Sequence, residues 1–272
     1  MSRVVVTLTT IPSRLSFDDE QGIKMCINSI VSQSYDNYEI HFNIPYSHKF
    51  LNQNYDVPEW LSSIDKIQIF RTEDHGPVTK LLPTVERLTD PEDIIITVDD
   101  DLVYHQDMVK EQINNQAKWP EYCVGYDGLR SRDDDGNFSR HFTDTRDYYY
   151  TSNYRNSKVD ILQHYKTISY KRRFFEEDFF DFVTENYSWS DDLLISSYMA
   201  FKKRVRYATY HPDDEQFESY DQWIQRGGAL TFPVIRSTHH EQLEGCNLFR
   251  NAQIIDDQKN LYQRYIDKGY MI

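Results

Sequence analysis

The stretch PEDIIITVDDD, residues 91–101, joins a short run of apolar and β-branched residues to three consecutive carboxylates. Ile94 to Val98 shows no clear alternation of polar and apolar residues, which predicts a strand buried on both faces, as in a parallel sheet covered by helices. Ligands of open α/β sheets bind just beyond the carboxyl ends of the strands. The stretch therefore predicts an α/β fold with a site at Asp99, Asp100 and Asp101.

The three carboxylates have the chemistry of a divalent-metal site. In an extended backbone Asp99 and Asp101 would share a face and Asp100 would point away. Two carboxylates at ~4 Å repel by roughly 4 kcal/mol at a surface-like dielectric, and a bound cation would turn this repulsion into affinity. Oxygen ligands of this kind suit Mg²⁺ or Mn²⁺. A solvated acidic turn after a strand is the alternative that the tripeptide leaves open.

Composition excludes several classes of protein. The chain has 272 residues, 27% charged and 15% aromatic, which is not a disordered composition. A formal net charge of −14 argues against broad binding to nucleic acids or anionic membranes. Cys26, Cys123 and Cys246 lack CxxC spacing and suit a reducing compartment. With no signal-peptide pattern and no run of ~20 apolar residues, we expect a soluble cytoplasmic protein without an integral membrane segment.

Strands and helices largely alternate up to residue 101, the pattern of a mostly parallel sheet with flanking helices. Expected strands are Val4 to Leu8, Glu39 to Ile44, Lys66 to Phe70 and Ile94 to Asp101, and expected helices are about 18–33, a helical face over Leu81 to Leu88, and Asp107 to Lys118. Residues 124–156 show little regularity. Further strand-like and helical patterns follow at residues 232–236 and from Ile254 to Gly269.

Polar residues that follow the first and third strands are candidates for anion binding. Thr9 and Arg14 come after the first strand and could hold a nucleotide, or could belong to a simple loop. Lys80, in GPVTKLLP at residues 76–83, lies at a predicted helix start, where a phosphate would meet both the lysine and the helix N-terminus. An ordinary turn with a solvated lysine is the alternative. The basic residues 171–173 could meet a diphosphate, but they are interpreted as a solvated edge.

Two later segments carry further candidates. Ser190 is a good N-cap, and acids in the first turn of the helix would complement its dipole, which could by itself explain Asp191 and Asp192. The functional interpretation is that one of these two carboxylates is a general base. His239 and His240 follow the strand-like residues 232–236 and could complete a metal site. Tyrosines in residues 144–155 suit sugar rings as well as ordinary packing.

Together these motifs resemble the GT-A glycosyltransferases, and most closely the small, soluble, DXD-containing enzymes of bacterial and large-virus glycan synthesis. The matching stretches are VTLTTIPSR at 6–14, SIVSQSY at 29–35, GPVTKLLP at 76–83, TVDDD at 97–101 and SDD at 190–192. The resemblance implies a single Rossmann-like domain over residues 1–272, with a nucleotide-sugar half at about 1–103 and an acceptor half at about 104–272. One departure is that YKTISY, residues 165–170, stands where many relatives carry a glycine-rich stretch.

The resemblance also implies roles for individual residues. Those expected around the nucleotide sugar are Thr9, Arg14, Lys80, Asp99 and Asp100. Those expected to hold Mn²⁺ or Mg²⁺ are Asp101, Asp99 and either His239 or His240. The expected catalytic base is Asp192, with Asp191 as the second choice.

The expected reaction is transfer of a hexose, deoxyhexose or pentose from a nucleotide sugar, with UDP as the expected carrier, to a glycan acceptor. Loss of a nucleoside diphosphate builds negative charge that a divalent metal neutralises, and an inverting enzyme needs a carboxylate to accept the proton of the acceptor hydroxyl. Two alternatives remain open. A nucleotidyltransferase also places metal-binding acids at strand ends but usually has a glycine-rich basic loop, whereas residues 9–14 contain no glycine. A catalytically silent carbohydrate-binding protein could retain the same fold.

Overall fold

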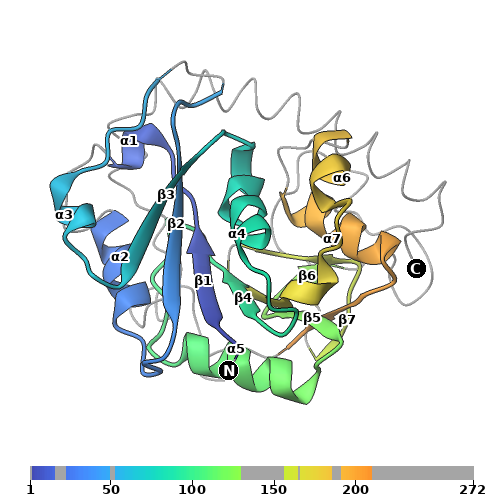
Figure 1. Ribbon diagram of the computed structural model, residues 1–272. Helices are drawn as coiled ribbons and strands as arrows, with labels where there is room; N and C mark the ends of the chain where they lie inside the picture. Colours follow the sequence, from blue (N-terminus) through green and yellow to red (C-terminus); the bar gives the residue numbers. More distant parts are fainter. Residues whose placement is uncertain are drawn as a thin grey trace, which may run out of the picture.

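An eight-stranded sheet in the order β3-β2-β1-β4-β9-β5-β10-β7 forms the centre of the computed structural model (Figure 1). The structure describes residues 2–15, 23–49, 53–129, 156–164, 166–185 and 191–209. The strands of this sheet are β1 Val4–Leu8, β2 Glu39–Pro45, β3 Ile67–Thr72, β4 Ile94–Thr97, β5 Tyr122–Gly125, β7 Ser157–Lys158, β9 Ile168–Lys171 and β10 Val205–Ala208. A separate pair joins β6 Gly128–Leu129 to β8 Ile161–Leu162.

The sheet is mostly parallel, as the alternation of strands and helices predicted. β3, β2, β1 and β4 are paired in parallel, and β10 is parallel to β5. β9 runs antiparallel between β4 and β5, and β7 is antiparallel to β10 at the edge. Thr7 is in register with Thr97, so the loops that follow β1 and β4 leave the sheet at the same edge.

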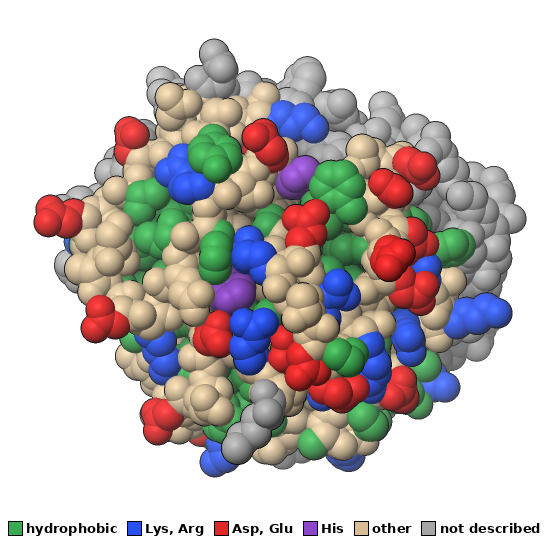
Figure 2. Space-filling view, in the orientation of Figure 1, with side chains coloured by type: hydrophobic (Ala, Val, Ile, Leu, Met, Phe, Trp, Pro, Cys, Tyr) green, Lys and Arg blue, Asp and Glu red, His purple; other side chains and the backbone are tan. Residues whose placement is uncertain are grey.

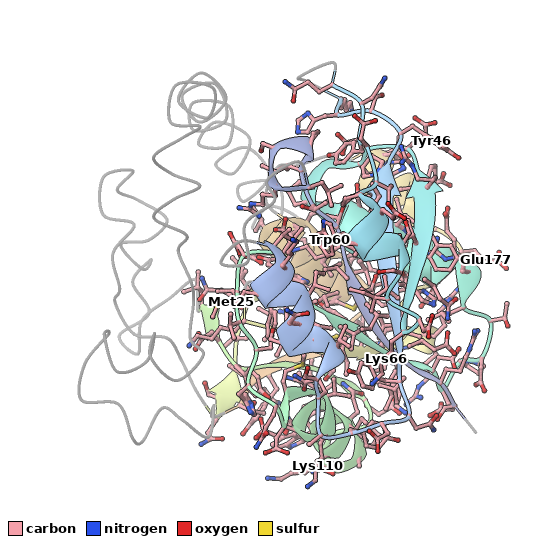
Figure 3. All side chains as sticks on the ribbon, turned by 90° about the vertical axis from the view of Figure 1, so that its left-hand side faces the viewer. Met25, Tyr46, Trp60, Lys66, Lys110 and Glu177 are labelled. Atoms are coloured by element: carbon pink, nitrogen blue, oxygen red, sulfur yellow. The ribbon has the colours of Figure 1, made fainter. Side chains whose placement is uncertain are left out.

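Helices cover both faces of the sheet, and side chains of β1 alternate between the two cores. Val6 packs with α2 and α5, whereas Val5 packs with α4, α6 and α7. In the side view of Figure 3, α2 lies in front of the sheet and α5 below it. The helical segments are α1 Pro12–Leu15, α2 Ile23–Val31, α3 Glu59–Ser62, α4 Leu82–Arg87, α5 Met108–Lys118, α6 Phe179–Glu185 and α7 Asp191–Phe201, with 3-10 turns η1 Gly76–Lys80 and η3 Arg172–Phe174.

The structure also corrects parts of the sequence analysis. β4 ends at Thr97, four residues before the predicted end. β5, β9 and β10 lie where no strand was predicted. Polar Ser169 is buried in β9, where it bonds to Gln112 Oε1 of α5 at 2.8 Å. The segments predicted at residues 232–236 and from Ile254 lie outside the described residues.

Charged side chains of both signs are interspersed on the face shown in Figure 2. Arg173, from the basic residues 171–173, pairs with Glu92 and lies 2.6 Å from Glu121. Lys202 lies 2.8 Å from Glu176 and 2.6 Å from Asp178. Within the described residues, no helix is long and apolar enough to cross a membrane.

Buried His41 on β2 is expected to make the fold sensitive to mild acid. Burial lowers the pKa of His41 to about 4, and the nearby Arg87 adds to this effect. The unfolded chain binds a proton near pH ~6.5, so stability is lost as the pH falls from about 6.5 towards 4. We expect His41→Asn to reduce the loss of unfolding free energy between pH 7 and 5 by about 2 kcal/mol.

Urea denaturation at both pH values measures this difference, with His48→Asn as the control for replacement of a partly exposed histidine. An unchanged pH dependence in His41→Asn would show that His41 takes up its proton over the same pH range in the folded and unfolded states.

Candidate functional site

Arg14 joins the loop after β1 to the acidic residues after β4. Its guanidinium pairs with Asp100, and its Nη2 lies 3.0 Å from Asp101 Oδ2. Thr10 Oγ1 donates to Asp100 Oδ2 at 2.5 Å. Asp100 is buried, whereas the side chain of Asp101 is 39% exposed. Asp100 therefore serves as a structural anchor for Arg14, and Asp101 remains accessible.

The strict alternation expected for Asp99, Asp100 and Asp101 is interrupted, because Asp100 and Asp101 lie in a bend after β4 and both pair with Arg14. Tyr104 closes this bend: its hydroxyl accepts from the Asp99 amide at 2.7 Å and donates to the Asp99 carbonyl at 3.2 Å. Asp100 and Asp101 share the Arg14 guanidinium instead of facing opposite ways. Asp99 is directed to a different cation.

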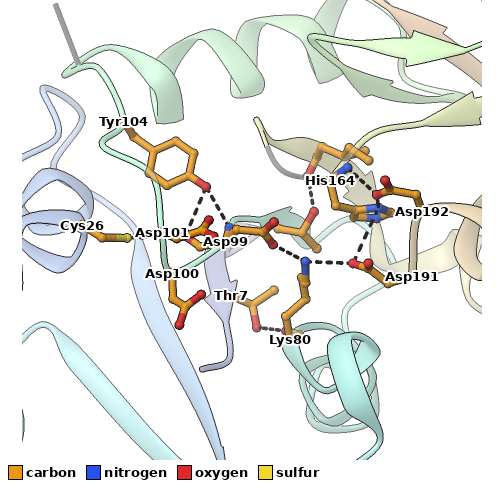
Figure 4. A network of polar contacts seen from close by, with 12 residues as sticks. Thr7, Cys26, Lys80, Asp99, Asp100, Asp101, Tyr104, His164, Asp191 and Asp192 are labelled. Atoms are coloured by element: carbon orange, nitrogen blue, oxygen red, sulfur yellow. Dashed lines mark hydrogen bonds and ion pairs between the residues drawn. The ribbon is translucent and has the colours of Figure 1, made fainter. Parts of the chain in front are cut away.

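That cation is Lys80, at the end of η1. Its ammonium pairs with Asp99 and lies 2.8 Å from Asp191 Oδ2 (Figure 4). Two hydrogen bonds fix the backbone of Lys80: Thr7 Oγ1 and Asn43 Nδ2 both donate to its carbonyl oxygen. Burial alone would lower the pKa of Lys80, but Asp191 and Asp99 outweigh burial and raise it. Lys80 is thus a fixed positive charge between the acidic bend and α7.

The N-terminus of α7 brings Asp191 and Asp192 to His164, a residue that sequence reasoning missed. His164 donates its backbone N–H to Asp192 Oδ1 at 2.7 Å, and its Nδ1 lies 2.9 Å from the same oxygen. His164 Nε2 lies 2.7 Å from the hydroxyl of Tyr170 on β9. No pattern around residue 164 signalled this role, since the histidine approaches α7 only through tertiary structure.

The surroundings of Asp191 and Asp192 at the start of α7 shift the pKa values of these two carboxylates in opposite directions. Burial opposes ionisation of Asp191, but Lys80 and then His164 outweigh it and hold the pKa of Asp191 below its ordinary value. Burial raises the pKa of Asp192, and the neighbouring Asp191 adds to this rise. Divergent pKa values within one pair of carboxylates are typical of separate roles. Asp191 is the permanent partner of Lys80, and Asp192 is the better proton acceptor.

Two places in this site have the donor atoms for a divalent ion. One is at Asp101, whose side chain is 39% exposed and contacts Arg14 through Oδ2. Among the described residues, Asp101 Oδ1 has no partner, and it therefore fits an incoming cation. The other is the trio His164, Asp191 and Asp192, whose ligand atoms lie within 4.8 Å of one another. The ammonium of Lys80 already contacts Asp191 there.

The structure brings seven of the predicted site residues to this edge of the sheet. Arg14 pairs with Asp100 and Asp101, Lys80 pairs with Asp99 and Asp191, and Asp192 contacts His164. Thr9 lies at the same sheet edge, but its hydroxyl donates to the carbonyl of Asn43 on β2 at 2.8 Å. His239 and His240 lie outside the described residues, so their place in the metal site stays a prediction.

Comparison with known proteins gives structural neighbours at low identity. No family model and no curated protein sequence matches the chain. One similar structure is 4-diphosphocytidyl-2C-methyl-D-erythritol synthase from Anaerococcus prevotii, with a TM-score of 0.49, 13% identity, and coverage of 83% of this chain and 94% of that one. A second structure with the same enzyme name has a TM-score of 0.49 and 9% identity, covering 89% and 99% of the two chains. S. aureus TarS, residues 1–349, has a TM-score of 0.42 and 11% identity, covering 77% and 60%.

Proposed function

We propose that the chain is a metal-dependent glycosyltransferase that moves a sugar from a nucleotide-sugar donor, a UDP-sugar, to a glycan acceptor. The observation that carries the proposal is that three consecutive acids, Asp99 to Asp101, contact both Arg14 and Lys80, and that Lys80 also contacts Asp191 at the start of α7. This arrangement places cations and candidate metal ligands next to a carboxylate suited to accept a proton.

In this proposal each group has a separate task. The bond between the sugar anomeric carbon and the diphosphate oxygen breaks, and its electron pair leaves with the nucleoside diphosphate. Arg14 and Lys80 contribute positive charge near that leaving group. The acceptor oxygen bonds to the anomeric carbon, and its proton passes to Asp192.

Asp101, with Asp99, would hold the divalent ion. Bound there, Mn²⁺ or Mg²⁺ would act as a Lewis acid towards the diphosphate. Arg14 pairs with two carboxylates, Asp100 and Asp101, and Lys80 pairs with two more, Asp99 and Asp191. Four carboxylates thus share two fixed cations, and the excess of negative charge is available for a metal to neutralise. The exposed side chain of Asp101 supplies the route of entry.

Asp101→Ala is expected to lower metal-dependent donor affinity at least ~10-fold, which corresponds to about 1.4 kcal/mol. The fold should remain, because Arg14 keeps its pair with buried Asp100. Thermal-shift titration with UDP and UDP-sugars, each with and without Mn²⁺, measures the effect, since a ligand of the folded state raises stability by mass action. Asp65→Ala removes an exposed carboxylate of the same charge and is the matched control.

Unaltered donor and metal binding in Asp101→Ala would place the metal site elsewhere. Incubation of the parent with a responding nucleotide sugar and a panel of oligosaccharides then tests transfer itself. Release of nucleoside diphosphate and a sugar-extended product supports the proposal. Stabilisation by nucleoside triphosphates with release of pyrophosphate would indicate a nucleotidyltransferase, and binding without turnover would indicate a silent carbohydrate-binding protein.

A further inference from the structure

His164 holds one oxygen of Asp192 through two separate donors. The backbone N–H lies 2.7 Å and the ring Nδ1 2.9 Å from Asp192 Oδ1. His164 is 1% exposed, so water does not compete for these contacts. Among the described residues, no hydrogen bond or ion pair engages the other oxygen, Oδ2, and the Asp192 side chain is 31% exposed. The carboxylate is therefore fixed on one side and open on the other.

Asp192 and Tyr170 together favour one tautomer of His164. An ionised carboxylate only accepts hydrogen bonds, so Nδ1 must be the donor to Asp192 in a neutral ring. Nε2 is then an acceptor, and the hydroxyl of Tyr170 donates to it at 2.7 Å. Burial raises the pKa of Tyr170 well above its usual value, so that hydroxyl keeps its proton.

Tyr170 is itself held by the core of the sheet. It is paired with Ile95 of β4 across the antiparallel ladder. Its ring meets that of Phe175 edge to face at 5.3 Å and stacks near His164 at 6.1 Å. Tyr170 and His164 thus connect Asp192 Oδ1 to the central sheet.

A metal-ligand role for His164 is disfavoured by the neighbouring charge. An ion held by His164, Asp191 and Asp192 would lie near the ammonium of Lys80, which is 2.8 Å from Asp191 Oδ2. Nδ1 also lies closer to Asp192, at 2.9 Å, than to Asp191, at 3.9 Å. The geometry is that of a hydrogen-bonded pair rather than of three ligands around a common centre.

We propose that His164 is a positioning residue that holds Asp192 Oδ1 so that Oδ2 is free to accept the proton of the acceptor hydroxyl. This inference rests on the proposed function. His164 keeps its own proton throughout: the acceptor proton ends on Asp192, and the sugar bond forms as the nucleoside diphosphate leaves. Tyr170 acts through His164 by maintaining its tautomer.

Three variants separate positioning from packing. His164→Asn keeps an N–H donor near the place of Nδ1, whereas His164→Gln extends its amide towards Nε2 and loses the ring contact to Asp192. We expect His164→Gln to lower kcat about 10- to 100-fold, because small misplacements of a catalytic group can cost that much, with donor KM changed less than about threefold. His164→Asn should restore kcat to within roughly fivefold of the parent. Tyr170→Phe should give an intermediate loss of kcat.

A second measurement, NMR of the parent and of Tyr170→Phe, does not depend on enzymatic activity. NMR chemical shifts of the His164 ring nitrogens report its tautomer, and we expect the proton on Nδ1, with a mixture of tautomers in Tyr170→Phe. A proton on Nε2 in the parent, or equal kcat in His164→Gln and the parent, would overturn the inference. If circular dichroism shows that His164→Gln does not fold, the inference is tested by the kcat of Tyr170→Phe and by the NMR tautomer of His164 in the parent. Absence of transfer in the parent, with Nδ1 protonated, would refute the proposed function but leave the His164–Asp192 geometry intact.

Discussion

Replacing Lys80 with methionine is expected to lower the free energy of unfolding by about 3–5 kcal/mol, the usual cost of removing one partner from a buried ion pair. Methionine has a similar length and apolar stem, so the change removes mainly the charge. Lys80 is 4% exposed and neutralises both Asp99 and Asp191. Without it, two partly buried carboxylates would face each other with no cation between them.

Urea unfolding followed by circular dichroism measures this loss, with Lys110→Met as the control for an exposed lysine on α5, which should change stability by less than ~0.5 kcal/mol. Lys80→Met combined with Asp191→Asn should recover part of the loss, because the double variant removes one of the stranded charges. The pKa of Asp191 is held below its ordinary value, so the gap between parent and Lys80→Met should narrow as acid protonates Asp191. A loss under ~1 kcal/mol would mean that water replaces Lys80 at little cost.

Asp192→Asn is expected to lower kcat by about 10²- to 10⁴-fold, the usual contribution of a general base. Asparagine preserves the shape and can still accept the His164 hydrogen bonds through its amide oxygen, so donor binding should remain within a few-fold of the parent. Asp192 Oδ2 is the open oxygen, and burial raises the pKa of this carboxyl. In the parent, kcat should therefore fall as the pH drops through the raised pKa, because the protonated acid no longer accepts a proton.

Steady-state kinetics with varied donor and acceptor test this expectation. Asp181→Asn replaces an exposed carboxylate on α6 and is the matched control. Transfer at the parental rate in Asp192→Asn would exclude Asp192 as the base and favour a retaining mechanism, which need not use one. Asp191→Asn should instead lose stability together with activity, since Asp191 is the partner of Lys80.

The strands of the amino-terminal half could be predicted from sequence because they are apolar runs that end at polar or turn-forming residues. β1 and β4 are buried on both faces, and nearly all of their side chains are therefore apolar or β-branched, which makes them recognisable in the sequence. β9 and β10 were missed for the opposite reason. β9 carries Ser169 and Lys171, and β10 carries Arg206, and these polar side chains are buried only because tertiary partners satisfy them.

Sequence alone was sufficient to predict a mostly parallel α/β sheet and an acidic site beyond β4, because both follow from local hydrophobic pattern and from where strands end. Arg14, Lys80 and the aspartates were candidates on that basis. Only the tertiary structure revealed that Lys80 bridges Asp99 to Asp191 and that His164 and Tyr170 support Asp192. These contacts join segments up to 111 residues apart, from Lys80 to Asp191, and their strength depends on burial and charge neutralisation, which no local pattern records.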